Sequence, residues 1–307
     1  MLRYIAKHFV SSLITLFFVV TITFFLMQAA PGNPFMNERS DPRVVARLME
    51  RYGYDRPVWE QYLNYLNDLL HGDLGESITD RSLTGMTVLE MLGKYFPNSA
   101  KVGGICALIS ISLSIPLGLL AAVKHDTLFD RCFIFLSSLF ASLPNFVMAV
   151  ALMLCFGVWL KVLPVAYLTD WKSYILPVFS MAFPQIFGLA RLMRTTMLDV
   201  IGQDYIRTAR AKGLPPYKVM FKHAFRNAML PVVTAVGPMI ATVLTGSMVI
   251  EGLFAIAGVG KYYVGSIGAR DYPMIMGTTI MFSALLILAN YVVDVLYGII
   301  DPRIKLE

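Results

Sequence analysis

Long runs of apolar positions, almost free of charged residues, recur along the chain. A helix that crosses a bilayer needs about 20 mostly apolar residues, and these runs are too continuous for the alternating strands of a membrane barrel. Open strands cannot cross lipid, because their edges would stay unsatisfied. The pattern therefore predicts an all-α integral membrane protein with six transmembrane helices, based on runs at Phe9–Ala30, Val102–Val123, Cys132–Leu160, Ser173–Ala190, Asn227–Ile250 and Tyr272–Val293.

The first run has a second interpretation, a cleaved signal peptide in which Arg3 and Lys7 form the charged region. Its apolar stretch is longer than the usual length of about 7–15 residues. The sequence Gln28-Ala29-Ala30 is also a poor cleavage site. We therefore expect an uncleaved helix.

Composition supports a membrane protein and excludes several other classes. Hydrophobic residues make up 57% of the 307 residues and charged residues 15%, with a mean hydropathy of +0.64. Soluble domains carry about 25% charge, so a disordered, nucleic-acid-binding or disulfide-stapled protein is excluded. The three cysteines lie in or beside apolar runs, and the four histidines lack metal-ligand spacing. Neither residue type predicts a metal site.

The net charge of +6 is concentrated in one segment. Between Arg191 and Arg226, eight basic residues face two acidic ones, so this segment carries the net charge of the whole chain. Cytoplasmic loops of membrane proteins carry an excess of Lys and Arg. We therefore place this segment and both ends of the chain in the cytoplasm, together with the neutral turn Lys124–Arg131.

These assignments divide the chain into four parts. Residues 1–30 form the cytoplasmic N-terminal end and the first helix, and residues 31–101 form a large extracytoplasmic loop. Residues 102–300 form the helical core, with a cytoplasmic loop over 197–229, and residues 301–307 form a cytoplasmic tail. Within the core we expect helices at about 102–123, 132–160, 173–196, 227–250 and 272–298.

The inner basic segment has the pattern of two helices joined by a sharp turn. Gln203 and Asp204 can cap a short helix over Tyr205–Lys212, and Gly213 can end it in a left-handed conformation. Pro216 suits the first turn of a second helix, which runs into the fifth span. On that helix we expect a basic stripe of Lys218, Lys222 and Arg226 beside an apolar stripe of Tyr217, Phe221, Ala224 and Ala228.

This segment has two interpretations. Its cations would either contact anionic lipid headgroups or dock a cytoplasmic partner. Charge alone does not separate the two. The helix–Gly–Pro–Pro–helix pattern favours docking, because it predicts a shaped element and not a polybasic tail.

Two carboxylates fall within the spans, Glu251 near the outer end of the fifth and Asp294 near the inner end of the sixth. A charge at such a site costs about 3 kcal/mol, so a proton or ion relay is one interpretation. Their opposite depths favour polar packing anchors. The sequence also lacks a G-x-x-x-x-G-K-[ST] phosphate loop and any catalytic or metal constellation. We therefore expect no enzyme activity, cofactor site or metal site in this chain.

Short motifs follow one another in a fixed order from end to end. The inner segment carries the most specific of them, Tyr205–Gly213 and His223–Pro231. The others are Ala30-Pro31-Gly32-Asn33-Pro34, Tyr52-Gly53-Tyr54-Asp55-Arg56-Pro57, Gly72-Asp73-Leu74-Gly75, Phe96-Pro97-Asn98-Ser99, Glu251-Gly252-Leu253-Phe254, Arg270-Asp271-Tyr272-Pro273 and Asp301-Pro302-Arg303. This ordered set resembles the oligopeptide and dipeptide permease branch of the ABC importers, and within it the first of the two permease subunits.

One departure concerns the inner loop of ABC importers in general, which carries Glu-Ala-Ala and then a Gly four positions after the second Ala. Alignment on Gly213 puts Arg207, Thr208 and Ala209 at those positions, so the second Ala and the Gly remain. Both this difference and the longer spacing from Gly213 to Pro231 resemble the loop of the peptide branch. Contacts of sugar or metal-oxyanion importers therefore do not transfer residue by residue.

The resemblance implies a type I ABC-importer permease fold in the plasma (inner) membrane of a bacterium. It implies a second homologous permease subunit, two cytoplasmic ABC ATPase subunits that bind the ATP, and an extracytoplasmic peptide-binding protein. The outer loop would face that binding protein or cap the path. The inner loop would couple the chain to the ATPases through Arg207, Thr208, Ala209, Arg210, Ala211, Lys212, Gly213, Leu214, Pro215, Tyr217, Lys218 and Met220.

Two alternatives stay open. The branches of this family share one scaffold, so the motifs do not separate peptide from nickel or another small solute. An ion-coupled secondary transporter that uses Glu251 or Asp294 belongs to a different class. It would transport without ATPase subunits.

Overall fold

The computed structural model describes residues 2–30, 35, 42–78 and 86–300, and the side chains of 9–30, 35, 43–78 and 86–293. The secondary structure of these residues is helical, with one isolated bridge between Glu76 and Thr87. Some residues discussed above lie outside the described part: Pro31–Pro34, the tail 301–307, and the side chains of Arg3, Lys7 and Asp294.

The described helices confirm an all-α membrane fold. Five are long and apolar enough to cross a membrane: Phe9–Ala29, Val88–Val123, Trp171–Ile201, Pro216–Leu253 and Tyr272–Val293. A sixth span results if the bent pair Leu128–Ser142 and Asn145–Trp159 is counted as one.

The third predicted span, Cys132–Leu160, contains Pro144 and is not one continuous helix. Helix α5 (Leu128–Ser142) ends before Pro144, and α6 (Asn145–Leu152) with a π-helical turn (Met153–Trp159) leaves at a bend of 104°. The cause is Pro144, because proline has no N–H to donate and forces the preceding residue out of the α conformation. Leu143 accordingly has extended dihedral angles, φ −85° and ψ 123°.

The helices form two compact units, and α4 (Val88–Val123) and α13 (Tyr272–Ile300) contribute to both. The first, here called the core unit, holds the described residues 100–256 and 286–300. The second, here called the outer unit, holds the described residues of 2–99 and residues 257–285. The outer unit therefore contains the first helix as well as the predicted extracytoplasmic loop.

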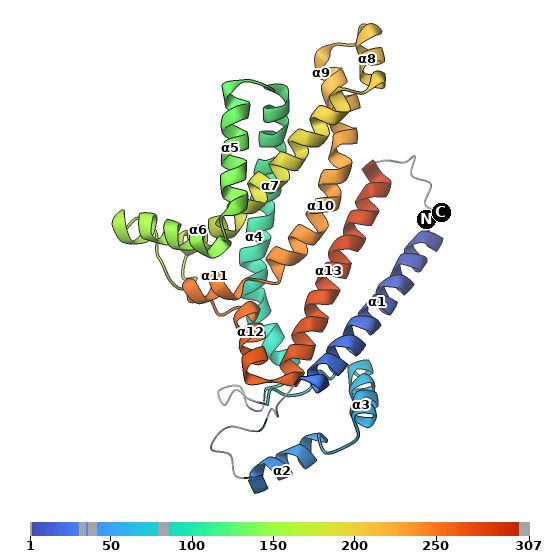
Figure 1. Ribbon diagram of the computed structural model, residues 1–307, viewed down its shortest axis with the longest axis vertical. Helices are drawn as coiled ribbons and strands as arrows, with labels where there is room; N and C mark the ends of the chain where they lie inside the picture. The colour runs from blue at the N-terminus through green and yellow to red at the C-terminus, as the bar shows by residue number, and fades with distance from the viewer. Residues whose placement is uncertain (1, 31–34, 36–41, 79–85, 301–307) are drawn as a thin grey trace. The chain divides into compact units, whose positions relative to one another are not determined.

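In the core unit, α7 (Ile175–Ile201) packs against α5, α6 and α10 (Arg226–Leu244) (Figure 1). Glycines let α4 approach its neighbours closely. A Cβ on Gly103 would lie 2.1 Å from the Val243 carbonyl oxygen of α10, and one on Gly118 would lie 2.3 Å from the Ala190 oxygen of α7. Any larger residue at these two positions would force the helices apart.

The predicted fifth span, Asn227–Ile250, also ends early. Helix α10 stops at Leu244, and α11 (Met248–Leu253) begins after a turn in which Gly246 has a φ of +78°. Glu251 lies on α11 and is 4% exposed. Its packing in the protein interior agrees with a polar anchor, but the position lies beyond the end of the long helix.

The outer unit contains α1 (Leu2–Ala29), α2 (Pro42–Tyr52), α3 (Val58–Leu70) and α12 (Val259–Ala269), with the adjoining parts of α4 and α13. Helix α4 begins at Val88, so the last part of the predicted 31–101 loop is helical. Phe24 of α1 packs on Tyr62 and Tyr65 of α3, with ring centroids 5.3 and 5.9 Å apart. Aromatic side chains therefore join α1 to α3 within this unit.

Candidate functional site

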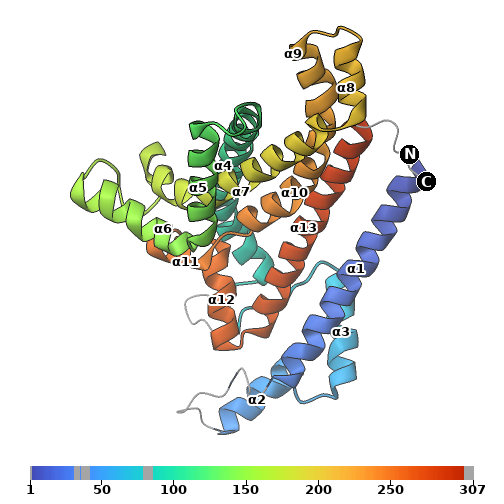
Figure 2. The same cartoon turned by 45° about the horizontal axis from the view of Figure 1, so that its top comes forward.

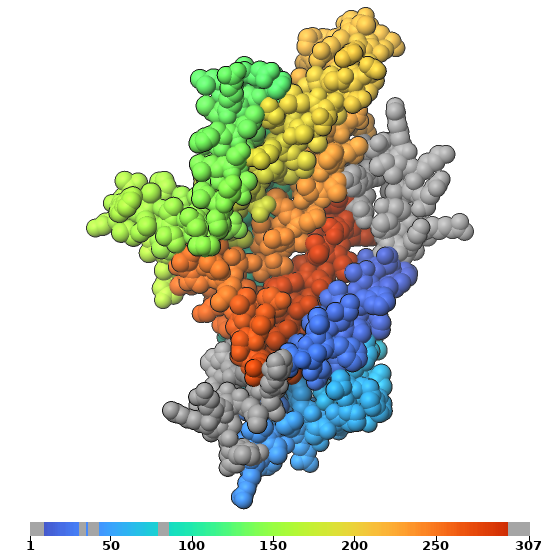
Figure 3. Space-filling view, viewed as in Figure 1, coloured from blue at the N-terminus to red at the C-terminus, as the bar shows by residue number. Residues whose placement is uncertain are grey.

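The most distinctive surface element is an elbow, defined here as residues 202–228. It consists of α8 (Asp204–Ala211), a turn, α9 (Pro216–Lys218), a π-helical segment (Val219–Phe225) and the start of α10. Figures 1 and 2 both show α8 and α9 side by side at the far end of α7 and α10. In the space-filling view they form a knob at that end of the core unit (Figure 3).

The turn of the elbow confirms the predicted role of Gly213. This residue has a φ of +76°, its N–H donates to the Arg210 carbonyl at 2.9 Å, and the Leu214 N–H reaches the Ala209 carbonyl at 3.4 Å. These two bonds satisfy the last carbonyls of α8 in a Schellman motif. Pro216 then takes the first position of α9, where its missing N–H costs nothing.

Other details of the predicted elbow are wrong. Gln203 is the N-cap residue of α8, but no side chain caps the helix. The second helix is π-helical over Val219–Phe225, so a four-residue spacing does not hold there. The predicted apolar stripe therefore divides: Tyr217 and Phe221 are 62% and 59% exposed, whereas Ala224 and Ala228 are buried.

Small and medium apolar side chains form the inside of the elbow. Ile206 and Ala209 of α8 are 0% and 7% exposed, and they belong to the same buried cluster as Val219, Ala224 and Ala228 of the second arm. A hydrogen bond closes the arms on the outside, where the Asn227 side chain donates to the Tyr205 hydroxyl at 2.8 Å. The elbow is therefore a packed element.

The structure divides the twelve predicted coupling residues by exposure. Ala209 is buried, so its side chain packs inside the elbow and does not face outward. Three others, Leu214, Pro215 and Met220, are partly buried. The exposed surface is formed by Arg207, Thr208, Arg210, Ala211, Lys212, Gly213, Tyr217 and Lys218.

The positive charge of the elbow comes from six of the eight cations counted in the sequence. Arg191 and Arg194 lie inside α7, where Arg191 donates to the Ser138 hydroxyl at 3.0 Å and Arg194 binds Asp130. The remaining six are Arg207, Arg210, Lys212, Lys218, Lys222 and Arg226, and all are exposed. With one exposed ion pair between Arg207 and Asp204 at 3.6 Å, the elbow presents a strongly basic surface.

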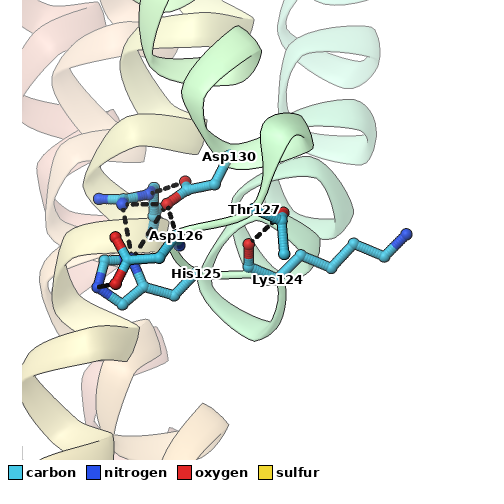
Figure 4. Close-up of polar contacts among 6 residues, drawn as sticks. Lys124, His125, Asp126, Thr127 and Asp130 are labelled. Carbon is cyan, nitrogen blue, oxygen red and sulfur yellow. Dashed lines mark hydrogen bonds and ion pairs between the residues drawn. The ribbon is translucent and has the colours of Figure 1, made fainter.

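A buried ion pair joins α5 to α7 in the core unit. The Arg194 guanidinium donates to both carboxylate oxygens of Asp130 at 2.6 and 2.7 Å, and the two side chains are 13% and 2% exposed. Figure 4 shows His125 beside Asp130 and the Asp126 carboxylate near the His125 ring, while Lys124 points away. The backbone N–H of Asp126 donates to Asp130 at 3.1 Å. The His125 Nδ1 lies 3.0 Å from Asp130 Oδ2. Sequence reasoning missed this pair, because its two members lie far apart in the chain.

His125, Asp126 and Asp130 are also close enough together to suggest a metal site, and they are the one such group in the part of the chain that the structure describes. The guanidinium of Arg194 already engages both Asp130 oxygens. A metal ion would have to displace this cation. The group is better explained as a charge-assisted link between helices.

In the outer unit, a buried carboxylate explains the Arg270-Asp271-Tyr272-Pro273 motif. Asp271 is 2% exposed and accepts hydrogen bonds from the Ser77 hydroxyl, the Ile78 N–H at 3.1 Å and the Met274 N–H at 3.3 Å. It therefore caps α13 and holds the segment at 77–78. This role was also missed, because the motif by itself does not name the partner segment.

The Gly72-Asp73-Leu74-Gly75 motif forms a turn beside that carboxylate. Gly72 and Gly75 have φ values of +78° and +81°, and the Gly75 N–H donates to the Asp73 carboxylate at 2.8 Å. A Cβ on Gly75 would lie 3.2 Å from the Cβ of Pro273. Left-handed backbone favours glycine, so the motif is explained by conformation and close packing.

Aromatic, amide and acidic side chains line a cavity of about 240 Å³ in the same unit. Tyr54 and Tyr272 contribute to its wall, with ring centroids 5.9 Å apart. Burial, and then the neighbouring Asp271 carboxylate, raise the pKa of Tyr54 above its ordinary value.

Comparisons with known proteins agree over the whole chain. Residues 114–306 match the family described as binding-protein-dependent transport system inner membrane component, and residues 1–114 match the N-terminal family of the same membrane components. A dipeptide transport system permease protein, DppB of Bacillus subtilis, is 43% identical and covers 100% of this chain and 99% of its own. The oligopeptide transport system permease protein OppB of Haemophilus influenzae is 38% identical over 99% of this chain and 100% of its own.

A solved structure supports the fold independently. An inward-facing form of the MetNI methionine ABC transporter has a chain that superposes with a TM-score of 0.55 at 15% identity, covering 69% of this chain and 97% of its own. At this identity the likeness concerns the fold alone, and it confirms the predicted ABC-importer permease fold. The chain is therefore a multi-pass protein of the bacterial inner membrane and belongs to the family of binding-protein-dependent transport system inner membrane components.

Proposed function

We propose that this chain is a permease subunit of an ATP-driven importer of peptides. The observation that carries the proposal is the identity of 43% and 38% to a dipeptide and an oligopeptide permease protein, which extends over essentially the whole length of each. The aligned region includes both the elbow and the outer unit. The alternative is an importer of nickel or another small solute, and the substrate test below distinguishes it from a peptide importer.

The proposed complex contains a second, homologous permease and two cytoplasmic ATPase subunits, and an extracytoplasmic binding protein delivers the peptide to residues 31–101. The elbow docks on one ATPase. Closure of the ATPases on ATP moves the elbow and shifts the spans between inward-open and outward-open arrangements. The packed interior of the elbow supports this role, because a rigid element transmits displacement to α7 and α10.

We also propose that both ends of the chain face the cytoplasm. The cations Arg3 and Lys7 precede the first span, and the exposed cations of the elbow follow the span that contains α7. This orientation fits the excess of Lys and Arg in cytoplasmic loops. It requires the bent pair Leu128–Ser142 and Asn145–Trp159 to count as one span.

The test is reconstitution of the complete transporter in proteoliposomes. Co-expression should yield a complex of this chain, its second permease and the ATPases, and loaded binding protein should stimulate ATP hydrolysis several-fold. Peptides, nickel chelates and buffer alone are compared as the load. Stimulation by a nickel chelate and not by peptide would contradict the substrate, and uptake by this chain without ATPases would contradict the class.

Gly213→Asp tests the coupling role of the elbow. A Cβ at Gly213 has no atom within 4 Å, and Asp is one of the residues that tolerate a left-handed conformation. We expect normal amounts of protein in the membrane and loss of peptide uptake, because the added negative charge alters the basic docking surface. Normal uptake in this variant would refute the coupling role.

A further inference from the structure

A pocket opens inside the elbow, between α8, the turn and the π-helical segment. Its volume is about 230 Å³. The walls include Ile206 of α8, Leu214 of the turn, and Val219 and Met220 of the π-helical segment, and the one charged residue among its lining is Arg210. The pocket is therefore apolar inside, with a single cation as its polar group.

The pocket exists because the residues at its base are small or already packed. Ala224 is 1% exposed and Val219 is 3% exposed, so neither side chain can turn to fill the space. Leu214 follows Gly213 and is held by the bond from its N–H to the Ala209 carbonyl. The local backbone thus keeps the pocket open.

We propose that this pocket receives one large apolar side chain of the ATPase subunit, with an acidic group of that subunit against Arg210. This inference rests on the proposed docking of the ATPase and specifies its chemistry. The expected contribution is substantial, because burying a side chain the size of Leu or Phe changes an affinity by about 10- to 100-fold.

The surface around the pocket favours a protein occupant. Tyr217 and Phe221 are exposed on the second arm, and the cations Lys212 and Lys218 flank the turn. Protein interfaces combine exposed aromatic residues and Arg with an apolar pocket at their centre. The net positive charge of the elbow selects an acidic partner surface.

The competing occupant is the acyl chain of an anionic lipid, whose phosphate would face Arg210. An acyl chain would fill the pocket in the absence of any ATPase. A side chain of the ATPase would fill it only in the complex. This difference gives the test its second arm.

The first arm measures the dissociation constant between the ATPase subunits and the purified membrane subunits. Leu214→Trp fills the pocket and Arg210→Glu reverses its charge, and each should raise the dissociation constant at least tenfold. The matched controls are Leu128→Trp and Lys124→Glu, which make comparable changes at exposed positions outside the elbow. Each control should change the dissociation constant less than threefold.

The second arm probes the pocket in the folded protein without a bulky substitution. Leu214→Cys is made in a chain whose Cys106, Cys132 and Cys155 are replaced by Ser or Ala, and the folded protein is treated with benzyl methanethiosulfonate. We expect the reagent to label the introduced thiol and to block ATPase binding, and bound ATPase should protect the thiol. The same protein in vesicles of anionic lipid without ATPase should be labelled at an undiminished rate.

Three results would overturn the inference. They are equal effects of Arg210→Glu and Lys124→Glu, unchanged binding after the pocket is filled, and protection of the thiol by anionic vesicles alone. In all three the ATPase still binds, so the proposed function survives. Failure of the unmodified subunits to bind any ATPase would instead refute the proposed function itself.

Discussion

The elbow and the outer turn at residues 72–78 both contain glycines with positive φ, yet different interactions stabilise them. The outer turn depends on a buried carboxylate, because Asp271 accepts hydrogen bonds from Ser77, Ile78 and Met274. The elbow depends on small apolar side chains inside, and its charges are outside. Family motifs cover both regions, so a motif alone does not tell a structural residue from one that meets a partner.

The largest expected effect is in the outer turn. Asp271→Ala leaves three donors without their acceptor, and each unsatisfied buried group costs about 1–3 kcal/mol. We expect a loss of more than about 3 kcal/mol, seen as a lower midpoint in thermal unfolding of the detergent-purified protein. Asp271→Asn keeps one carbonyl acceptor and should lose less. Equal midpoints for Asp271→Ala and the unmodified protein would show that these bonds do not hold the turn.

The elbow should instead lose stability when its interior is overpacked. Ala209 is 7% exposed, packs within the buried cluster and does not line the elbow pocket, so Ala209→Leu adds volume at a site that is already filled. Such overpacking costs about 1–3 kcal/mol. The midpoint of thermal unfolding should fall and ATPase binding should weaken. Ala211→Leu on the exposed face of α8 should leave the unfolding midpoint unchanged. An undiminished midpoint for Ala209→Leu would contradict the packed interior.

A matched pair of glycines compares the regions directly. Gly75→Ala and Gly213→Ala both place a Cβ at positive φ, at a cost of about 1–2 kcal/mol. At Gly75 the Cβ would also meet Pro273 at 3.2 Å, whereas at Gly213 it meets no atom within 4 Å. We therefore expect the unfolding midpoint to fall further for Gly75→Ala. The reverse order would mean that the elbow is the tighter of the two turns.

The smallest effect belongs to the surface of the elbow. The pair Asp204–Arg207 is separated by 3.6 Å, with side chains 97% and 76% exposed. Exposed ion pairs contribute little to stability, so Asp204→Asn should not change the unfolding midpoint. The salt dependence of ATPase binding is the informative measurement, because the variant makes the elbow more positive. A large loss of stability would show that the surface charges support the fold.

The sequence predicted the α8 boundaries to within one residue and the left-handed Gly213, because both depend on short-range backbone preferences. It failed over Val219–Phe225, since the choice between α and π hydrogen bonding depends on what the segment packs against. By sequence alone, Arg194 also counted among the basic residues of the cytoplasmic segment. Only the fold shows that this residue binds Asp130 of another helix.

The sequence by itself determined the class of the protein. Apolar runs of bilayer length require helices, because lipid offers the backbone no hydrogen bonds, and an ordered set of motifs indicated the family that the comparisons confirm. The tertiary structure decided which polar residues are buried in contacts between helices and which are exposed on the surface. Asp130, Arg194 and Asp271 have the same chemistry as many surface residues, and only contacts between distant segments separate them from the exposed cations of the elbow.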